Sequence, residues 1–177
     1  LNFELAKRHN GTFYIRFEDT NPEAVELEYY GESIKDYEWL GIKPDRIDYA
    51  SDFMEEFYKY AEKIIRDNHA FICTCKREEI KANRKNGVEC SCRYNQIDRN
   101  LEQWLNMFKA KAGKYVLRIK GNMKSPNATL RDPIVFRVID APHPRKKTKY
   151  RVWPNYDFES AIMDGVEGVT YRLRSKE

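Results

Sequence analysis

The stretch GTFYIRFEDTNP, residues 11–22, decides the predicted fold class. Apolar and polar side chains alternate over residues 12–18, which is the pattern of a β-strand with two different faces. Two carboxylates, Glu18 and Asp19, follow where this strand should end. In an open parallel sheet, ligands bind outside the carboxyl ends of the strands. The pair of carboxylates therefore marks a candidate binding site.

The segments around this strand predict an α/β arrangement. A helix over residues 1–9 should end at Asn10-Gly11, and apolar residues at helical spacing predict a second helix after the strand. A short strand is expected at 47–50, and Asp52 with Glu55 resembles a capping box that starts a third helix. The expected apolar stripe of this third helix consists of Phe53, Phe57, Tyr60 and Ile64. The order α-β-α-β-α indicates a parallel sheet with crossover helices.

The pattern changes near Ala70 and returns near Trp153, which predicts an inserted module. Short strands and polar helices alternate between these points, as expected for an α+β unit. We expect an α/β domain over 1–69, an insertion over 70–152, and the resumed domain over 153–177, where GVTYRLR reads as a final strand. LNFELAKR resembles the middle of a helix, and the chain stops directly after the last expected strand. The chain is therefore expected to be a piece of a longer protein.

The composition permits several partners and argues against a membrane protein. The 177 residues are 41% hydrophobic and 34% charged, with a formal net charge of +4 and a pI near 8.8. Such a mildly basic chain can bind nucleic acid, but its charge does not require it. No apolar run is long enough to span a bilayer. We expect a soluble, cytoplasmic protein, and the sequence indicates no oligomeric state.

Four cysteines form two C-x-C pairs, Cys73 with Cys75 and Cys90 with Cys92. Four thiolates are the ligand set of a structural tetrahedral zinc ion, although C-x-x-C is the commoner spacing. A disulfide would need an oxidising compartment, which nothing here indicates. The remaining alternative is four ordinary buried cysteines. The two matched pairs favour zinc, at a structural site with no catalytic role.

Two further groups of charges are candidates for binding. Arg174 should lie at the carboxyl end of the last strand, where it and Glu18 would hold a molecule with an ammonium and a carboxylate. The simpler alternative is that Glu18 pairs with Arg16 and that Arg174 is a surface charge. A basic loop interleaved with aromatic residues could follow a phosphate backbone, or be merely solvated. Its candidate residues for contacting nucleic acid are Arg145, Lys146, Lys147 and Lys149.

Several motifs together resemble the archaeal-type glutamyl-tRNA synthetases, which are similar to glutaminyl-tRNA synthetases. They are RFEDTNP, YEWLGIKPD, LRIKGNMKSPNATLRDPIVFRV and WPNYDFESAIMDGVEGVTYRLRSKE. The resemblance covers essentially the whole chain in order. It implies a class I aminoacyl-tRNA synthetase whose Rossmann-type parallel sheet is interrupted by a module that binds the tRNA acceptor stem. It further implies ATP as a substrate, Mg²⁺, glutamate and tRNA(Glu), with tRNA(Gln) left open.

The resemblance also implies roles for individual residues. Glu18 matches the acid that holds the substrate's α-ammonium, Tyr156 a tyrosine that contacts the amino acid, and Arg174 the position that reads its side chain. An arginine there suits a γ-carboxylate and penalises a neutral amide. No residue is assigned a catalytic role in proton transfer, because the substrate's carboxylate is itself the nucleophile.

This sequence also departs from the family pattern. It lacks the H-I-G-H and K-M-S-K-S signatures that handle ATP, so the 177 residues alone should be inactive. Tyr171 replaces a histidine of the family, and Asn155 replaces a threonine. The alternatives are a glutaminyl-tRNA synthetase core and a zinc-bearing RNA-binding module without catalysis.

Overall fold

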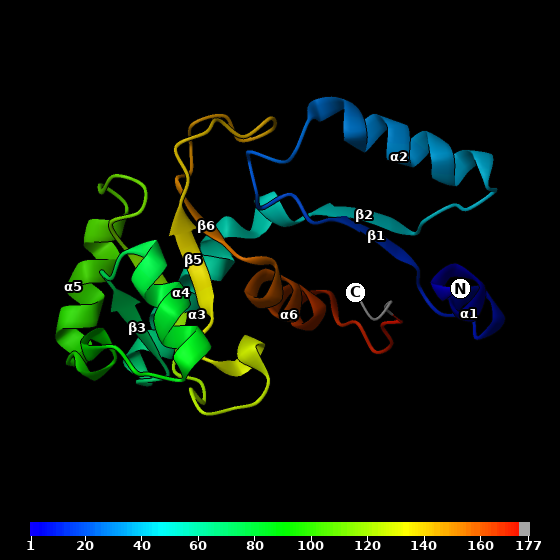
Figure 1. Ribbon diagram of the computed structural model, residues 1–177. Coiled ribbons are helices and arrows are strands. Elements are labelled where there is room, and N and C mark those ends of the chain that lie inside the picture. The colour runs from blue at the N-terminus through cyan, green and yellow to red at the C-terminus, as the bar shows by residue number, and fades with distance from the viewer. Residues whose placement is uncertain (174–177) are drawn as a thin grey trace.

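The computed structural model describes residues 1–173 of the chain (Figure 1). Its helices are α1 (Asn2–Arg8), α2 (Leu27–Trp39), α3 (Met54–Arg66), α4 (Arg77–Asn86), α5 (Ile97–Met107) and α6 (Tyr156–Glu167). Its strands are β1 (Tyr14–Phe17), β2 (Arg46–Tyr49), β3 (Ala70–Cys73), β4 (Val116–Ile119), β5 (Ile134–Val138) and β6 (Val152–Pro154). Within these residues, no helix is both long enough and apolar enough to cross a bilayer.

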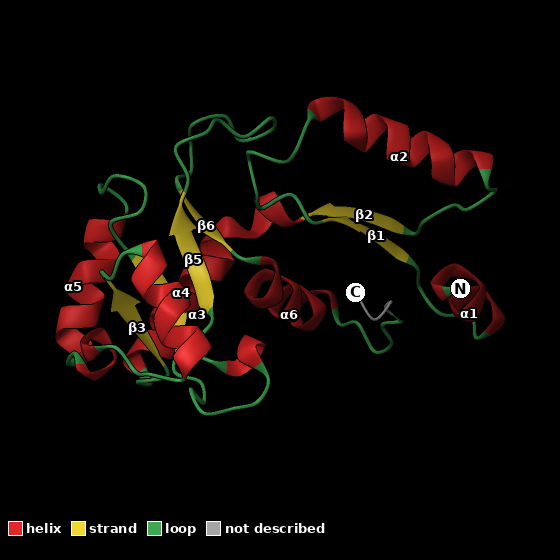
Figure 2. Cartoon of the chain, viewed as in Figure 1, coloured by secondary structure: helices red, strands yellow, loops and turns green. Residues whose placement is uncertain are grey.

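The strands form two separate sheets, as Figure 2 shows. β1 and β2 pair in parallel, with α2 as the crossover between them. β3, β4, β5 and β6 form an antiparallel sheet in that order. This combination of parallel and antiparallel pairing confirms the predicted mixed α/β fold. The predicted boundary between residues 152 and 153 falls inside β6, and the division into domains stays a prediction.

The two faces of β1 contact different helices. The Phe17 ring meets the Tyr30 ring of α2 edge to face, with centroids 5.1 Å apart. On the opposite face, Arg16 donates hydrogen bonds to Asp164 at 2.8 Å and Glu167 at 2.7 Å, both on α6. Because side chains alternate along a strand, Glu18 continues the face of Arg16, toward α6. In Figure 1, α2 and α6 lie on opposite sides of the β1–β2 pair.

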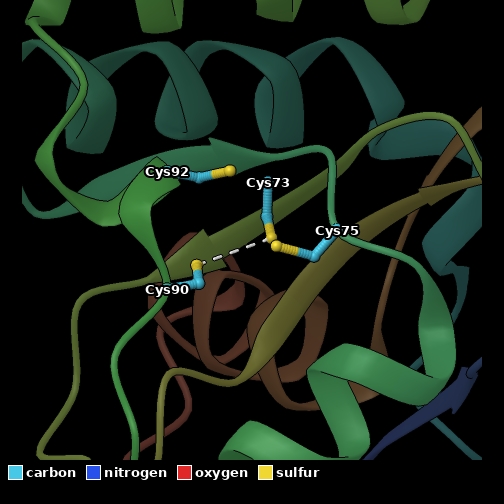
Figure 3. Close-up of side chains that lie close together, drawn as sticks. All are labelled: Cys73, Cys75, Cys90 and Cys92. Carbon is cyan, nitrogen blue, oxygen red and sulfur yellow. Dashed lines mark hydrogen bonds between the residues drawn. The ribbon is translucent and has the colours of Figure 1, made fainter.

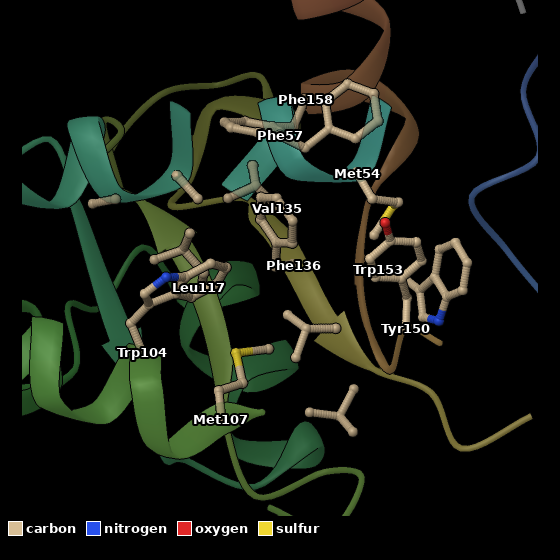
Figure 4. Packing of buried hydrophobic residues seen from close by; sticks show 14 of the residues in the cluster. Met54, Phe57, Trp104, Met107, Leu117, Val135, Phe136, Tyr150, Trp153 and Phe158 are labelled. Atoms are coloured by element: carbon tan, nitrogen blue, oxygen red, sulfur yellow. The ribbon is translucent and has the colours of Figure 1, made fainter. Parts of the chain in front are cut away.

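The main hydrophobic core lies between the antiparallel sheet and helices α3, α5 and α6 (Figure 4). The α3 residues buried in it are Met54, Phe57, Ala61 and Ile65. The predicted stripe was therefore correct at Phe57 but wrong at Tyr60, which is 42% exposed. Ala61, four residues after Phe57, takes the buried position instead, and Phe53 and Ile64 are partly buried against the core.

Two local predictions, the capping box of the third helix and the final strand, were wrong. In both segments, groups bind residues that are distant in the sequence. The expected capping box is absent: Phe53 is the N-cap residue of α3, without a side-chain hydrogen bond, while Asp52 pairs with Arg145. The expected final strand is absent from its described residues, 168–173. There, the Leu173 backbone N–H and C=O bond to the side-chain amide of Asn2 instead of to a neighbouring strand.

Candidate functional site

A cavity of about 400 Å³ opens between the carboxyl end of β1 and the amino end of α6. Glu18 reaches it from β1, and Tyr156, the first residue of α6, lies across it. The chain thus brings two of the three predicted amino acid-binding residues to one cavity. The other residues that line the cavity are Thr20, Asn21, Arg137, Asn155 and Asp157.

Glu18 is partly exposed in this cavity and contacts two arginines. Arg16 Nε donates to Glu18 Oε1 at 3.1 Å, which is the pairing expected from the simpler alternative. Arg172 Nη2 lies 3.5 Å from the same oxygen and donates to the Tyr156 hydroxyl at 3.0 Å. The Glu18 side chain is still 28% exposed. Its carboxylate therefore remains accessible from the cavity while the arginines fix its position.

Asp19, beside Glu18, is buried and has a structural role. Its Oδ1 accepts a hydrogen bond from the Ser51 backbone N–H at 2.7 Å, and its Oδ2 accepts the Ser51 and Tyr30 hydroxyls, each at 2.8 Å. Burial, together with the charge of Asp19, raises the pKa of Tyr30 well above its ordinary value. Of the two adjacent carboxylates in the FED motif, one thus faces the cavity, and the other joins the end of β1 to α2 and to the turn after β2.

His143, to which the sequence analysis gave no role, completes this attachment. Its Nδ1 accepts hydrogen bonds from the backbone N–H groups of Arg145 and Lys146, so its Nε2 carries the proton and donates to the Asp19 carbonyl at 2.8 Å. The ring stacks on Trp153 with centroids 5.1 Å apart, and burial lowers the pKa of His143. The imidazole is therefore neutral and holds the basic loop against the end of β1.

Arg174, the predicted reader of the substrate's side chain, lies outside the described residues. Its convergence with Glu18 thus stays a prediction. Arg172, two residues before Arg174, is described, and it contacts both Glu18 and Tyr156. It also donates to Asp164 on α6 at 2.7 Å.

Two charged residues near the cavity were missed by the sequence analysis. Arg137 lines the cavity from β5, and burial lowers its pKa. The signal that could have found it is a lone arginine within the apolar run IVFRVID. Glu159 on α6 is fully buried, and neither of its carboxyl oxygens has a hydrogen-bond partner. Burial, with Glu18 nearby, raises its pKa to about 10, so Glu159 is a neutral acid behind the cavity.

The four cysteine sulfurs gather at one point near the end of β3, as Figure 3 shows. All lie within 4.8 Å of one another, and the Cys73 and Cys90 sulfurs are 3.8 Å apart. A tetrahedral zinc ion with bonds of about 2.3 Å places its sulfurs about 3.8 Å apart. All four cysteines are free thiols, so the disulfide alternative is not realised here. The donor set and its spacing fit a structural zinc ion.

The electrostatics of this cluster favour at least one thiolate. The hydrogen bond with Cys73, helped by the charge of Arg118, lowers the pKa of Cys90 to about 5 against the cost of burial. The same pairing raises the pKa of Cys73, and burial raises that of Cys75 to about 12.

The basic loop divides into two bound and two exposed cations. Arg145 stacks on the Tyr49 ring, 3.6 Å from its centroid, and donates to Asp52, with which Lys146 also pairs. Lys147 and Lys149 are exposed. Of the four candidates for contacting nucleic acid, only the last two therefore have charges free of a carboxylate partner among residues 1–173.

Comparisons with known proteins agree over the whole chain. The family model described as "tRNA synthetases class I (E and Q), catalytic domain" matches residues 1–177. Glutamate–tRNA ligases of Pyrococcus abyssi and Nitrosopumilus maritimus are 45% and 43% identical, and a glutamine–tRNA ligase of Saccharomyces cerevisiae is 42% identical. Each alignment covers 100% of this chain, but only 32%, 31% and 23% of the respective relative. The chain thus spans a third or less of these proteins.

A solved structure shows the same fold. The crystal structure of a glutamate tRNA ligase from Elizabethkingia meningosepticum aligns with a TM-score of 0.63 at 20% identity. The alignment covers 96% of this chain and 38% of that one. The arrangement of both sheets and their helices is therefore shared with that enzyme.

Proposed function

The chain belongs to the class I tRNA synthetases of the E and Q type, and from this membership we propose that it forms the amino acid-binding part of a glutamate–tRNA ligase. The whole protein would activate glutamate with ATP, release pyrophosphate and pass the glutamyl group to the 3′ end of tRNA(Glu). ATP and Mg²⁺ are the general requirements of this family.

The observation that carries the proposal is the cavity shared by Glu18 and Tyr156. Glu18 offers a fixed, accessible carboxylate, which suits an α-ammonium group, and Tyr156 lies within the same space. Arg137 adds a positive charge to the wall of the cavity. A cavity that carries both signs of charge fits a zwitterionic amino acid.

The residues of this chain bind and orient the amino acid, and they move no proton. The substrate's carboxylate is already a nucleophile, and the α-phosphate of ATP is its target. Holding the ammonium at Glu18 fixes the direction in which the carboxylate points, which is catalysis by positioning. Cations around the phosphates would stabilise the charge that develops there.

Selectivity for glutamate over glutamine is assigned to Arg174. A guanidinium pairs with a γ-carboxylate through two hydrogen bonds, whereas a neutral amide would leave the arginine's charge uncompensated. In the full-length protein, Arg174→Cys should therefore weaken discrimination against glutamine. An unchanged amino acid preference would count against this assignment.

We also propose a structural zinc ion at Cys73, Cys75, Cys90 and Cys92. The gathering of four sulfurs within 4.8 Å supports it. Bound zinc would join the end of β3 to the segment after α4 by coordination bonds. We expect about one metal per chain by elemental analysis. Four freely reactive thiols without metal would contradict the site.

The exposed lysines of the basic loop, Lys147 and Lys149, are proposed to contact the tRNA acceptor end. Arg145 and Lys146 would support them indirectly, by pairing with Asp52 and fixing the loop.

The proposed activity is tested in the full-length protein by glutamate-dependent exchange of pyrophosphate into ATP. Glu18→Gln keeps the side chain's size but removes its charge, and loss of a charge-assisted hydrogen bond should raise KM for glutamate about 10- to 100-fold. Glu28→Gln, on the exposed side of α2, is the matched control and should leave KM unchanged. Absence of glutamate-dependent exchange, or an unchanged KM in Glu18→Gln, would overturn the proposal.

A further inference from the structure

Arg118 is a fully buried cation without a carboxylate partner among residues 1–173. It lies on β4, and the whole residue is 1% exposed. Its Nε donates to the backbone carbonyl of Asp132 at 2.9 Å, and its Nη2 has no partner. A buried charge is costly unless an opposite charge lies close to it. The position of Arg118 thus requires an explanation.

Asp132, whose backbone carbonyl accepts from Arg118, carries a carboxylate that binds other groups. Its Oδ1 accepts hydrogen bonds from Arg93 and from the Gly121 backbone N–H, and its buried Oδ2 has no hydrogen-bond partner. Arg118 contacts only the main-chain carbonyl of Asp132, which bears no full charge. Among residues 1–173, no carboxylate is hydrogen-bonded to the Arg118 guanidinium, so the other groups that it faces are the candidates for compensating its charge.

The groups that face Arg118 are cysteine sulfurs. Its Nη1 points at two of them, 3.5 Å from Cys90 Sγ and 3.7 Å from Cys73 Sγ. The sheet register produces this contact: Arg118 pairs with Phe71 on β3, and Cys73 lies two residues further along the same face. The guanidinium also stacks over the Phe71 ring, 5.3 Å from its centroid, which holds it in this orientation.

We propose that Arg118 is a positioning residue of the four-cysteine site, whose buried charge stabilises the sulfurs as thiolates around a metal ion. This inference rests on the zinc site proposed above. Four thiolates and one Zn²⁺ carry a net double negative charge, which is unfavourable in a buried site. Arg118 neutralises half of it and donates a hydrogen bond to two of the ligands. Groups in this position commonly change metal affinity by 10- to 100-fold.

The experiment compares zinc affinity among variants of the chain, by competition with a chromophoric chelator. Arg118→Met keeps an unbranched apolar stem and removes the guanidinium and its charge, and it should weaken zinc binding about 10- to 100-fold. Arg118→Lys keeps the charge without the planar fork of donors, and should lie between Arg118→Met and the wild type. Arg84→Met is the control, because Arg84 is an arginine that donates to backbone carbonyls, as Arg118 does, but its hydrogen bonds go to no sulfur.

A second readout separates this role from simple packing. Arg118→Met should lower the melting temperature more in the zinc-loaded chain than in the zinc-free chain, whereas a packing role would lower both equally. Cobalt-loaded protein provides a third readout, since the thiolate-to-metal absorption reports the sulfur ligands directly. If Arg118→Met fails to fold, Arg118→Lys against the wild type still decides the outcome.

Each result has a distinct meaning. Zinc binding by the wild type with unchanged affinity in Arg118→Met and Arg118→Lys would overturn the role of Arg118 and keep the zinc site. A wild-type chain that binds no zinc would overturn both. Neither result bears on the amino acid cavity, which pyrophosphate exchange tests separately.

Discussion

Replacement of Glu159 by Gln should stabilise the chain at neutral and alkaline pH. Glu159 is fully buried on α6, and neither oxygen has a hydrogen-bond partner. Burial first, then the carboxylates of Glu18 and Asp19, raise its pKa from 4.5 to about 10, against the opposing effect of the Arg16 charge. Between these two values the folded chain holds a proton that the unfolded chain has released.

The sign and size of the effect follow from this difference in bound protons. Because the pKa of Glu159 is higher in the folded chain than in the unfolded chain, its contribution to the unfolding free energy is fully present below pH 4.5. This contribution is lost as the pH rises toward 10. At pH 7.5, about three pH units above the unfolded pKa, keeping the proton costs up to about 4 kcal/mol. Gln is neutral at every pH and avoids this cost. Glu159→Gln should therefore gain about 2–4 kcal/mol at pH 7.5 and almost nothing near pH 4.

The assay is urea unfolding of the wild type and Glu159→Gln at several pH values, taking the difference in unfolding free energy at each. Other titrating groups are common to both proteins and largely cancel in that difference. Glu102→Gln, on the exposed side of α5, controls for the substitution itself and should show no trend with pH. A difference for Glu159→Gln that stays constant from pH 4.5 to 8 would show that Glu159 is ionised when folded, and would refute the reasoning.

Three further substitutions test the packing and the basic loop. Phe57→Ala should cost about 3–5 kcal/mol in chemical unfolding, because Phe57 is fully buried, whereas Tyr60→Ala, one turn on but 42% exposed, should cost about 1 kcal/mol or less; equal losses would contradict the observed register of α3. Gly121→Ala should lose about 1–3 kcal/mol, since its Cβ would lie 2.1 Å from a backbone carbonyl oxygen, and an unchanged melting temperature would refute that close approach. Replacing Lys147 and Lys149 by Ala in the full-length protein should reduce the slope of log affinity for tRNA against log salt by about 1.5, and an unchanged slope would remove the loop from the interface.

The features that the sequence predicted correctly are those set by neighbouring residues. The alternation over residues 12–18 is a local property of β1, and the burial of Ile15 on one face with Arg16 on the other follows from it. The two C-x-C pairs likewise identified a cluster that the fold assembles, because a ligand set of one residue type is recognisable without knowing its geometry.

The features that could not be predicted from the sequence depend on contacts between residues that are far apart in the chain. Asp52 carries the local signature of a capping box, yet Arg145, 93 residues away, binds it. A salt bridge of this separation leaves no periodic signal. Glu159 shows the same limit, since it lies on an ordinary helical segment and only the packing of α6 buries it.

The buried attachment of Asp19 accounts for how Glu18 is held at the cavity. Glu18 lies just beyond the last residue of β1, at the start of a loop, and loop residues are ordinarily more mobile than strand residues. The next residue, Asp19, accepts three hydrogen bonds from α2 and from the turn after β2, and its carbonyl accepts a fourth from His143 in the basic loop. Three segments distant in sequence thereby fix the backbone on the far side of Glu18, while Arg16 fixes its carboxylate from the near side. A carboxylate fixed from both sides loses little further freedom on binding an ammonium group, so its position before binding contributes directly to affinity.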